Sequence, residues 1–313
     1  MGFTVASLPD LTGQIYFVTG GNAGIGLETI KALASKGATV YLGARSESKA
    51  TAAIATIRES INNPDAPIHY IYLDHMDLST IVAGAQSFLS KETALHGLLL
   101  NAGIMCTPWE VSKDGYEAHF QTNYLSHFLL TELLLPILKT TALNCEPGVV
   151  RFVEMASGAY MFAKSPGIFF DQIDMPKHEP IDRYSQSKLA NVLHANEINK
   201  QLGPKEKVAE KGEIWVSSVD PGLVETGLSA SYASTSLLGR TLIRLGMAAT
   251  PAKGALTPIF ATAGNGFKRE WSGAHIVPGA KPRVLIRQGK DQALQDKLYK
   301  WTGEQLKSKG FLT

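Results

Sequence analysis

The chain has 313 residues, of which 44% are hydrophobic, and its 30 basic and 28 acidic side chains leave a formal net charge of +2 at pH 7. Because the charges balance and form no long block of one sign, they give no indication of a nucleic-acid partner or of an anionic membrane surface. The composition predicts a soluble globular protein with a sizeable buried core.

Cysteine and histidine content argues against disulfides and metal. Cys106 and Cys145 are too few for a disulfide framework and lack the paired spacing of a zinc site, so we interpret both as buried thiols. His119 and His127 lack a credible third, acidic ligand and are interpreted as structural, and we expect no metal. The first ten residues lack the basic start and apolar run of a signal peptide, which favours a cytoplasmic location. No apolar stretch reaches the roughly 20 residues of a membrane span.

Apolar, β-branched runs alternate with helix-length segments along the whole chain. We expect strands near 14–18, 39–44, 68–73, 97–101, 148–155 and 213–219, and helices near 25–36, 46–61, 78–91, 112–138, 183–202 and 250–264. A short last strand is expected near 274–277, after which Pro278, Gly279 and Pro282 break regular structure. The alternation predicts an α/β fold in one domain over residues 1–313, a doubly wound parallel sheet with helices on both faces.

A glycine-rich turn follows the first expected strand. Residues 19–26 read TGGNAGIG and lead into the first expected helix. Glycines let such a turn bring backbone N–H groups close to a pyrophosphate at the helix N-terminus. Taken alone, the turn also fits a plain connection between a strand and a helix.

A tyrosine and a lysine stand four residues apart much further along the chain. Tyr184 and Lys188 lie in an expected helix and so share one of its faces. A free phenol titrates near pH 10, and a neighbouring ammonium favours the phenolate. We therefore expect Lys188 to bring the pKa of Tyr184 towards the working range of a general acid or base. Taken alone, this spacing arises by chance in many chains.

With both motifs present in this order, the chain resembles the short-chain dehydrogenase/reductase family, and in particular its retinol-dehydrogenase-like branch, over about residues 12–280. The resemblance rests on the TGxxxGxG pattern of residues 19–26, on the NAG element at residues 101–103 and on YSQSKLAN at residues 184–191. It implies a Rossmann-type fold and an oxidoreductase that interconverts an alcohol and a ketone or aldehyde with a nicotinamide cofactor.

The resemblance also implies the residues of the site. Tyr184 would exchange the proton, Ser157 would hold the substrate oxygen and Lys188 would tune Tyr184. The backbone of Asn123 would hold a water next to Lys188. Cofactor binding is implied for the glycine turn, the strand ends and the later motifs, namely Gly20, Gly24, Ile25, Gly26, Arg45, Asp74, Asn101, Ala102, Gly103, Tyr184, Lys188, Pro221, Gly222, Val224 and Thr226.

The residue after the second expected strand predicts which cofactor is bound. Arg45 stands where a carboxylate would bind the adenosine ribose hydroxyls, and a guanidinium binds the extra phosphate of NADP through charge-assisted hydrogen bonds. We therefore predict NADP over NAD, the alternative being a solvated arginine at the start of a loop. After the third strand, Asp74 is preferred to Asp77 as the adenine partner because of its position.

The substrate pocket is expected to be formed by loops, broadly residues 159–183 and 223–249. Apolar side chains in these loops and near residue 105 suit a lipophilic, natural-product-like carbonyl compound, or alternatively pack the core; they are Met105, Trp109, Tyr160, Met161, Phe162, Leu228 and Tyr232. Asp220 departs from the branch, in which histidine is more common at that position. This departure argues against inferring the substrate from close relatives, and it does not bear on the cofactor site.

The resemblance also implies an oligomeric state, and two alternative functions stay open. Beyond a small-molecule substrate, the resemblance implies a homodimer or homotetramer formed through the helices over 112–138 and 183–202. A non-catalytic NADP-binding regulator or scaffold stays open, because a dinucleotide fold does not dictate chemistry. So does a redox-neutral epimerase or dehydratase of the same family, which net consumption of NADPH would exclude.

Overall fold

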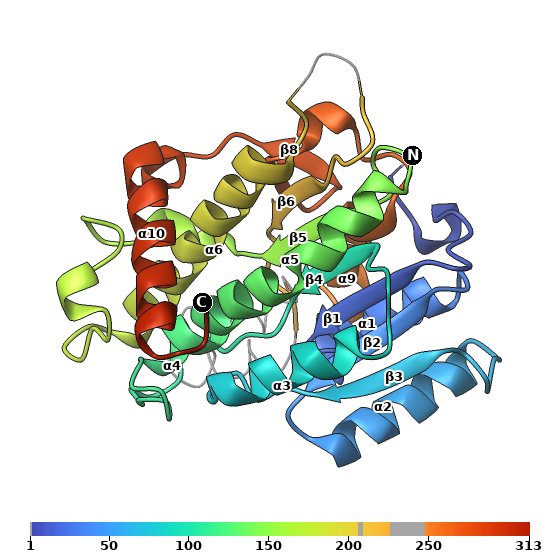
Figure 1. The fold of residues 1–313 in the computed structure, drawn as a ribbon, viewed down its shortest axis with the longest axis horizontal. Coiled ribbons are helices and arrows are strands. Elements are labelled where there is room, and N and C mark those ends of the chain that lie inside the picture. The colour runs from blue at the N-terminus through green and yellow to red at the C-terminus, as the bar shows by residue number, and fades with distance from the viewer. Residues whose placement is uncertain (1, 206–208, 226–247) are drawn as a thin grey trace.

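The computed structural model describes residues 2–205, 209–225 and 248–313, and the strands in these ranges form one sheet (Figure 1). The strand order is β3-β2-β1-β4-β5-β6-β7-β8. Neighbours from β3 to β7 pair in parallel, and β8 runs antiparallel to β7. The predicted, mostly parallel α/β sheet is thereby confirmed. Its strands are β1 (Ile15–Thr19), β2 (Thr39–Ala44), β3 (Ile68–Tyr72), β4 (Gly97–Leu100), β5 (Arg151–Met155), β6 (Trp215–Val219), β7 (His275–Val277) and β8 (Lys281–Arg283).

Helices cover both faces of the sheet and enclose two hydrophobic cores (Figure 1). Successive strand residues point to opposite faces, so Phe17 lies in one core and Val18 in the other. Phe152 and Val153 of β5 are divided between the two cores in the same way, so both faces of this strand are buried. One face carries α1 (Gly24–Ala34), α2 (Glu47–Ser60) and α9 (Pro251–Ala263), and the other carries α3 (Leu78–Leu89), α5 (Ser126–Leu143) and α6 (Pro180–Leu202).

The helix expected over 112–138 is divided into three parts. α4 (Ala118–Phe120) begins after Glu117, whose carboxylate accepts the Phe120 N–H at 3.0 Å. A π-helical turn, η2 (Gln121–Leu125), then leads into α5. The prediction of a single helix is therefore wrong at its start, where Ser112 N–H donates to the Tyr116 carbonyl in a turn. It is also wrong at its end, because α5 continues to Leu143.

Two elements near the C-terminus were not predicted. β8 contains Pro282, which an edge strand tolerates because a missing N–H there breaks no ladder between central strands. A helix, α10 (Gln292–Ser308), begins at Asp291, whose carboxylate accepts the Leu294 N–H at 2.9 Å. Its buried stripe mixes polar and apolar residues, and Leu294 and Trp301 pack against the same core beside it at helical spacing; the stripe is Gln295, Leu298, Thr302 and Leu306.

α10 packs against α5 and α6 (Figure 1). Its buried Gln295 donates to Glu197 of α6 at 2.7 Å, and its Tyr299 hydroxyl donates to Glu132 of α5 at 2.8 Å. Nearly every position of α6 from Asp182 onwards is buried by the same chain. The helix over 183–202 is therefore not available as the predicted subunit interface, because α10 covers its outer face.

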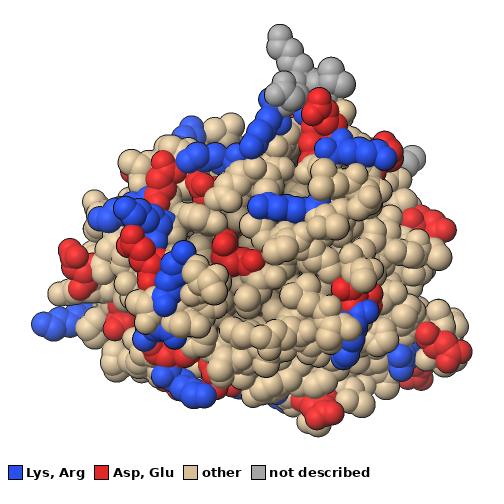
Figure 2. Space-filling view, viewed as in Figure 1, with Lys and Arg blue, Asp and Glu red and all other residues tan. Residues whose placement is uncertain are grey.

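Charged groups on the face shown in Figure 2 are mixed in sign. Lysines and arginines alternate there with aspartates and glutamates, with a large uncharged area between them. This distribution agrees with the near balance of 30 basic and 28 acidic side chains. Within the described ranges, no helix has the length and apolar character needed to cross a membrane.

Shortening Leu298 tests the packing of α10. Leu298 is 1% exposed and belongs to the core beneath α10. We expect Leu298→Ala to lower the free energy of unfolding by about 2–5 kcal/mol, because it leaves a cavity. Lys300→Ala is the control, since Lys300 makes only an exposed pair with Glu304 and contributes about 0.5 kcal/mol. Urea unfolding followed by tryptophan fluorescence measures both, and equal losses would contradict this packing.

Candidate active site

The residues predicted to bind the cofactor lie where the parallel strands end. The strand order reverses between β1 and β4, and ligands of such sheets bind at the carboxyl ends of the strands around this switch point. Thr226, Leu228 and Tyr232 lie outside the described residues. The strand-end residues are Gly20 after β1, Arg45 after β2, Asp74 after β3, Asn101, Ala102 and Gly103 after β4, Ser157 after β5, and Pro221, Gly222 and Val224 after β6.

The glycine turn forms a tight cradle at the start of α1. Gly20 has a φ of +66°, and a Cβ there would lie 2.8 Å from the Ala102 Cα. A Cβ on Gly26 would meet the Gly20 carbonyl and lie 2.6 Å from Asn101 Nδ2. The residue preceding α1, Ala23, offers no side-chain cap, so N–H groups of the first turn remain available to an anion. The cradle thus fits the pyrophosphate of a dinucleotide.

Thr19 and Asn101 tie this cradle to β4. The Asn101 side-chain amide donates to the Thr19 carbonyl at 2.9 Å and to the Gly20 carbonyl at 3.2 Å. In return, the Thr19 hydroxyl oxygen accepts the N–H groups of Asn101 at 2.8 Å and Ala102 at 3.0 Å. The turn after β1 is therefore fixed to the turn after β4.

Arg45 and Asp74 occupy the ends of β2 and β3. Arg45 is exposed and forms no hydrogen bond or ion pair with the residues that the structure describes. Asp74 accepts the Met76 N–H at 3.0 Å. Asp77 instead caps α3, where it accepts the Ser79 N–H at 3.0 Å. These positions are consistent with the preference for Asp74 over Asp77.

Asn123 lies in η2, fully buried, and both its side chain and its carbonyl are engaged. The side chain accepts the Ile104 N–H at 2.8 Å and donates to the Ser187 hydroxyl at 2.9 Å. The carbonyl oxygen accepts Asn191 Nδ2 at 2.7 Å and His127 Nδ1 at 3.0 Å, which accounts for both of its lone pairs. The expected water on the carbonyl of Asn123 is therefore wrong, because protein side chains occupy it.

Tyr184 and Lys188 share one face of α6 and are 5% and 4% exposed. The Lys188 ammonium donates to the Met155 carbonyl at 2.7 Å and lies 5.8 Å from the centroid of the Tyr184 ring. Ser157 follows β5 and accepts the Ala159 N–H at 3.2 Å. A Cβ on Gly103 would lie 3.8 Å from Lys188 Nζ, so the turn after β4 reaches the same place.

Burial dominates the titration of this pair. It raises the pKa of Tyr184 above its usual value, while the Ser157 hydroxyl lowers it and the Asp220 carboxylate raises it further. Burial lowers the pKa of Lys188 to about 8, against the Glu154 and Asp220 carboxylates, which raise it. The predicted lowering of the Tyr184 pKa is therefore wrong in direction, because burial outweighs an ammonium that is directed to the Met155 carbonyl.

A buried ionic cluster next to Tyr184 was missed. Glu117 and Arg183 are 1% and 3% exposed, with 3.2 Å between Arg183 Nε and Glu117 Oε1. His119 Nδ1 lies 2.5 Å from the same carboxylate oxygen, and its ring centroid is 6.4 Å from that of Tyr184. Arg183 also donates to the Thr107 carbonyl at 3.3 Å, which joins the loop after β4 to α6. Nothing local in the sequence indicates this pairing.

The side chains expected to line the pocket divide between core and surface. Tyr160 is 1% exposed, packs edge-on against His275 and accepts the Ile286 N–H at 3.3 Å, so it belongs to the core. Phe162 and Trp109 are 69% and 45% exposed. The expectation is therefore wrong for Tyr160. Met105 and Met161 are half-buried.

The two cysteines differ in how deeply they are buried. Cys106 is buried, and burial raises the pKa of its thiol to about 11. Cys145 is only half-buried, so the prediction of two buried thiols is wrong for this residue, which follows the end of α5. Across the described part of the chain, no group of three or more His, Cys, Asp or Glu side chains is arranged to hold a metal ion.

Comparison with known proteins gives consistent matches. The sequence profile of the family described as short chain dehydrogenase matches residues 14–164. Short-chain dehydrogenase/reductase drtF of Aspergillus calidoustus is 44% identical over 98% of both chains. Polyprenol dehydrogenase of Homo sapiens is 32% identical over 95% of this chain and 86% of its own. A crystal structure of an uncharacterized protein from Mycobacterium paratuberculosis shares the fold with a TM-score of 0.74, at 26% identity over 98% of both chains.

Adding a methyl group at Gly26 tests the cradle. In Gly26→Ala the new Cβ meets the Gly20 carbonyl and the Asn101 amide, so the turn must shift. We expect the affinity for NADPH to fall by about 10-fold or more. Gly303→Ala in α10 is the control, because its methyl group meets nothing within 4 Å. A fluorescence titration with NADPH measures both variants, and an unchanged affinity in Gly26→Ala would refute the role of the cradle.

Proposed function

The chain belongs to the short-chain dehydrogenase/reductase family, and from this premise we propose that it is an NADP(H)-dependent oxidoreductase that interconverts an alcohol and a ketone or aldehyde. One observation carries the proposal. Ser157, Tyr184 and Lys188 form a complete set beside the carboxyl edge of the sheet, where the glycine cradle also lies. A regulator or scaffold has no need of this set.

The chain's own residues supply the proton and hold the substrate oxygen. Bound nicotinamide supplies the hydride chemistry. The hydroxyls of Ser157 and Tyr184 hold the carbonyl oxygen, and Tyr184 donates the proton when that carbonyl is reduced. Because burial raises the pKa of Tyr184, its hydroxyl is protonated at neutral pH and ready to donate. Lys188 lies beside it and carries the positive charge of the site.

The end of β2 supports NADP as the cofactor. Arg45 is exposed and has no carboxylate partner among the described residues, so its guanidinium is available to a phosphate group. β2 itself ends in Gly43 and Ala44, which offer no carboxylate to ribose hydroxyls.

We further propose a lipophilic, natural-product-like substrate. Trp109 follows β4 and Phe162 follows β5, and both expose large apolar surfaces beyond the carboxyl ends of these strands. Apolar linings of this kind suit an apolar ligand. The name of one relative, polyprenol dehydrogenase, states a lipophilic alcohol as that protein's substrate.

Removing one hydroxyl tests the role of Tyr184. We expect Tyr184→Phe to reduce turnover by about 10²–10⁴-fold, because the proton donor is lost, and to keep the affinity for NADPH within about twofold. Tyr299→Phe is the matched control, since its hydroxyl contacts Glu132 on α5, away from the site. The measurement follows NADPH absorbance with a panel of lipophilic ketones, aldehydes and quinones. Wild-type rates in Tyr184→Phe would refute the assignment, and tight NADPH binding without any turnover would favour a scaffold.

Reversing one charge tests the cofactor preference. We expect Arg45→Asp to change the ratio of kcat/KM with NADPH to kcat/KM with NADH by about 10-fold or more in favour of NADH, because a carboxylate repels the 2′-phosphate. Lys91→Asp, a charge reversal at an exposed site after α3, is the control and should leave the ratio unchanged. Equal use of both cofactors by the unmodified protein would contradict the role of Arg45.

A further inference from the structure

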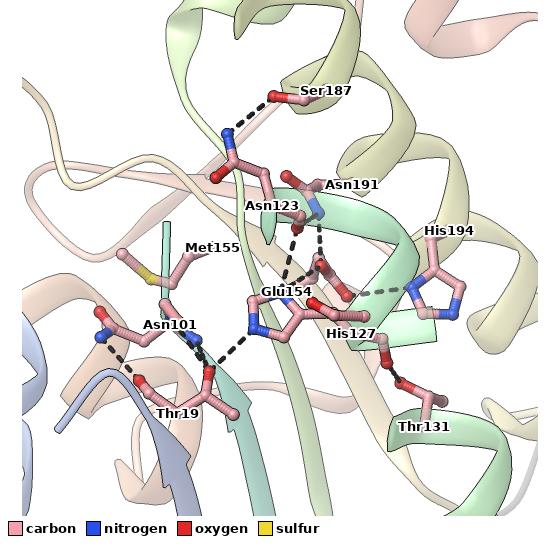
Figure 3. A network of polar contacts seen from close by, with 12 residues as sticks. Thr19, Asn101, Asn123, His127, Thr131, Glu154, Met155, Ser187, Asn191 and His194 are labelled. Atoms are coloured by element: carbon pink, nitrogen blue, oxygen red, sulfur yellow. Dashed lines mark hydrogen bonds and ion pairs between the residues drawn. The ribbon is translucent and has the colours of Figure 1, made fainter. Parts of the chain in front are cut away.

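Glu154 is a carboxylate buried in β5, between β4 and β6, and has no part in the proposed site so far. Its side chain is 0% exposed, and a buried charge of this kind is costly unless hydrogen bonds compensate it. Two side chains of α6 do so: Asn191 Nδ2 donates to Oε1 at 2.6 Å, and His194 Nδ1 donates to Oε2 at 3.0 Å (Figure 3). Burial is the largest influence and raises the pKa of Glu154 above its usual value, while these two hydrogen bonds oppose it and favour the ionised carboxylate.

A series of hydrogen bonds also connects Thr19, at the start of the glycine turn, to the surroundings of Glu154 (Figure 3). The Thr19 hydroxyl oxygen already accepts two backbone N–H groups, from Asn101 and Ala102, so its own proton is directed to His127 Nε2 at 2.9 Å. His127 is therefore neutral with its proton on Nδ1, which donates to the Asn123 carbonyl at 3.0 Å. Burial, which lowers the pKa of His127, agrees with this neutral form.

Asn191 joins this series to Glu154. Its side-chain amide nitrogen donates both to the Asn123 carbonyl at 2.7 Å and to Glu154 Oε1 at 2.6 Å. The carboxylate thereby orients Asn191, and Asn191 holds the η2 turn that presents Asn123. Without the carboxylate oxygen, nothing else in the described structure accepts the second amide hydrogen.

The same strand end also holds the catalytic lysine. Lys188 lies one turn before Asn191 on α6, and its ammonium donates to the carbonyl of Met155, the residue after Glu154. Two carboxylates raise the pKa of Lys188, Glu154 of β5 and Asp220 after β6, and the centroid of the Tyr184 ring lies 5.8 Å from its ammonium. The charge of Lys188 in turn lowers the pKa of His127, which is neutral. Burial lowers the pKa of Lys188 to about 8, and Glu154 is the first of the two carboxylates that oppose this.

We propose that Glu154 is a positioning residue of the reaction: its buried carboxylate orients Asn191 and Asn123 and places a negative charge next to the Met155 carbonyl that holds the Lys188 ammonium. The inference rests on the proposed function, because the pair of Tyr184 and Lys188 acts only if the chain is an oxidoreductase. It assigns a task to the fully buried carboxylate of β5 and to the histidine that faces it on α6.

Glu154→Gln tests the charge while keeping the shape. The amide oxygen still accepts from Asn191, and His194 accepts from the new NH₂ group through Nδ1 when its proton moves to Nε2, so the fold is retained. Without the negative charge the pKa of Lys188 falls below about 8, and the ammonium is lost at a lower pH as the pH rises. We therefore expect the alkaline limb of the pH profile of kcat/KM to move down by about one pH unit, with the affinity for NADPH at pH 6 unchanged.

Two further variants separate charge from structure. Glu197→Gln removes another buried carboxylate of α6, one that contacts Gln295 of α10, and should leave the alkaline limb in place. Glu154→Asp keeps the charge but draws it away from Asn191, so we expect the limb to stay near its wild-type position while kcat falls. An unchanged limb in Glu154→Gln, or an equal shift in Glu197→Gln, overturns the inference.

A measurement without substrate distinguishes failure of this inference from failure of the proposed function. NMR of the full chain with labelled lysine, assigned with Lys188→Arg, gives the pKa of Lys188 directly. A lower pKa in Glu154→Gln than in the wild type supports the role of the charge even if no substrate is turned over, in which case only the proposed function fails. An unchanged pKa overturns the inference whether or not turnover is found.

Discussion

The carbonyl oxygen of Asn123 accepts two side-chain hydrogen bonds, and the arrangement of the site depends on them. One donor, His127, lies four residues further along the same continuous helical run, and the other, Asn191, comes from α6, so the second bond sets the spacing between η2 and α6. Since α6 also carries Tyr184, the same spacing places the phenol. The Asn123 side chain then holds the backbone of Ile104, and with it the loop after β4. The backbone and side chain of Asn123 thus connect η2, α6 and the loop after β4.

Burial strengthens the electrostatic interactions of the charged groups at this site. Tyr184 and Lys188 are almost completely buried. Electrostatic interactions in the protein interior are screened less than at the surface. The phenol consequently keeps its proton, and the ammonium depends on nearby carboxylates to keep its charge. Asp220 has opposite consequences for the two groups, since it opposes ionisation of the phenol and favours the charged ammonium. Both tendencies suit a site that delivers a proton to a carbonyl oxygen.

Local signals predicted the sheet and the strand-end residues, and long-range contacts decided the rest. The glycine turn after β1 and the apolar runs could be predicted because each feature is complete within a few residues. α10 was not predicted, although Leu294, Leu298 and Trp301 have helical spacing, because its buried stripe also holds Gln295 and Thr302, whose partners lie on other helices. For the same reason Tyr160 resembled a pocket residue until its contact with His275 was known. Glu154 is one of two charged residues in β5, with Arg151, and its partners Asn191 and His194 lie far away in the sequence.

The cover that α10 provides has a consequence for biosynthesis. α10 follows all eight described strands in the chain, yet it supplies hydrogen-bond partners to Tyr124 of η2 and to Glu197 of α6. Because synthesis proceeds from the N-terminus, α5 and α6 are made before the helix that covers them, and a domain folds as a unit. Until α10 has been made, Tyr124 and Glu197 lack these hydrogen-bond partners. The helix that carries Tyr184 therefore reaches its final environment only after the last described helix has left the ribosome.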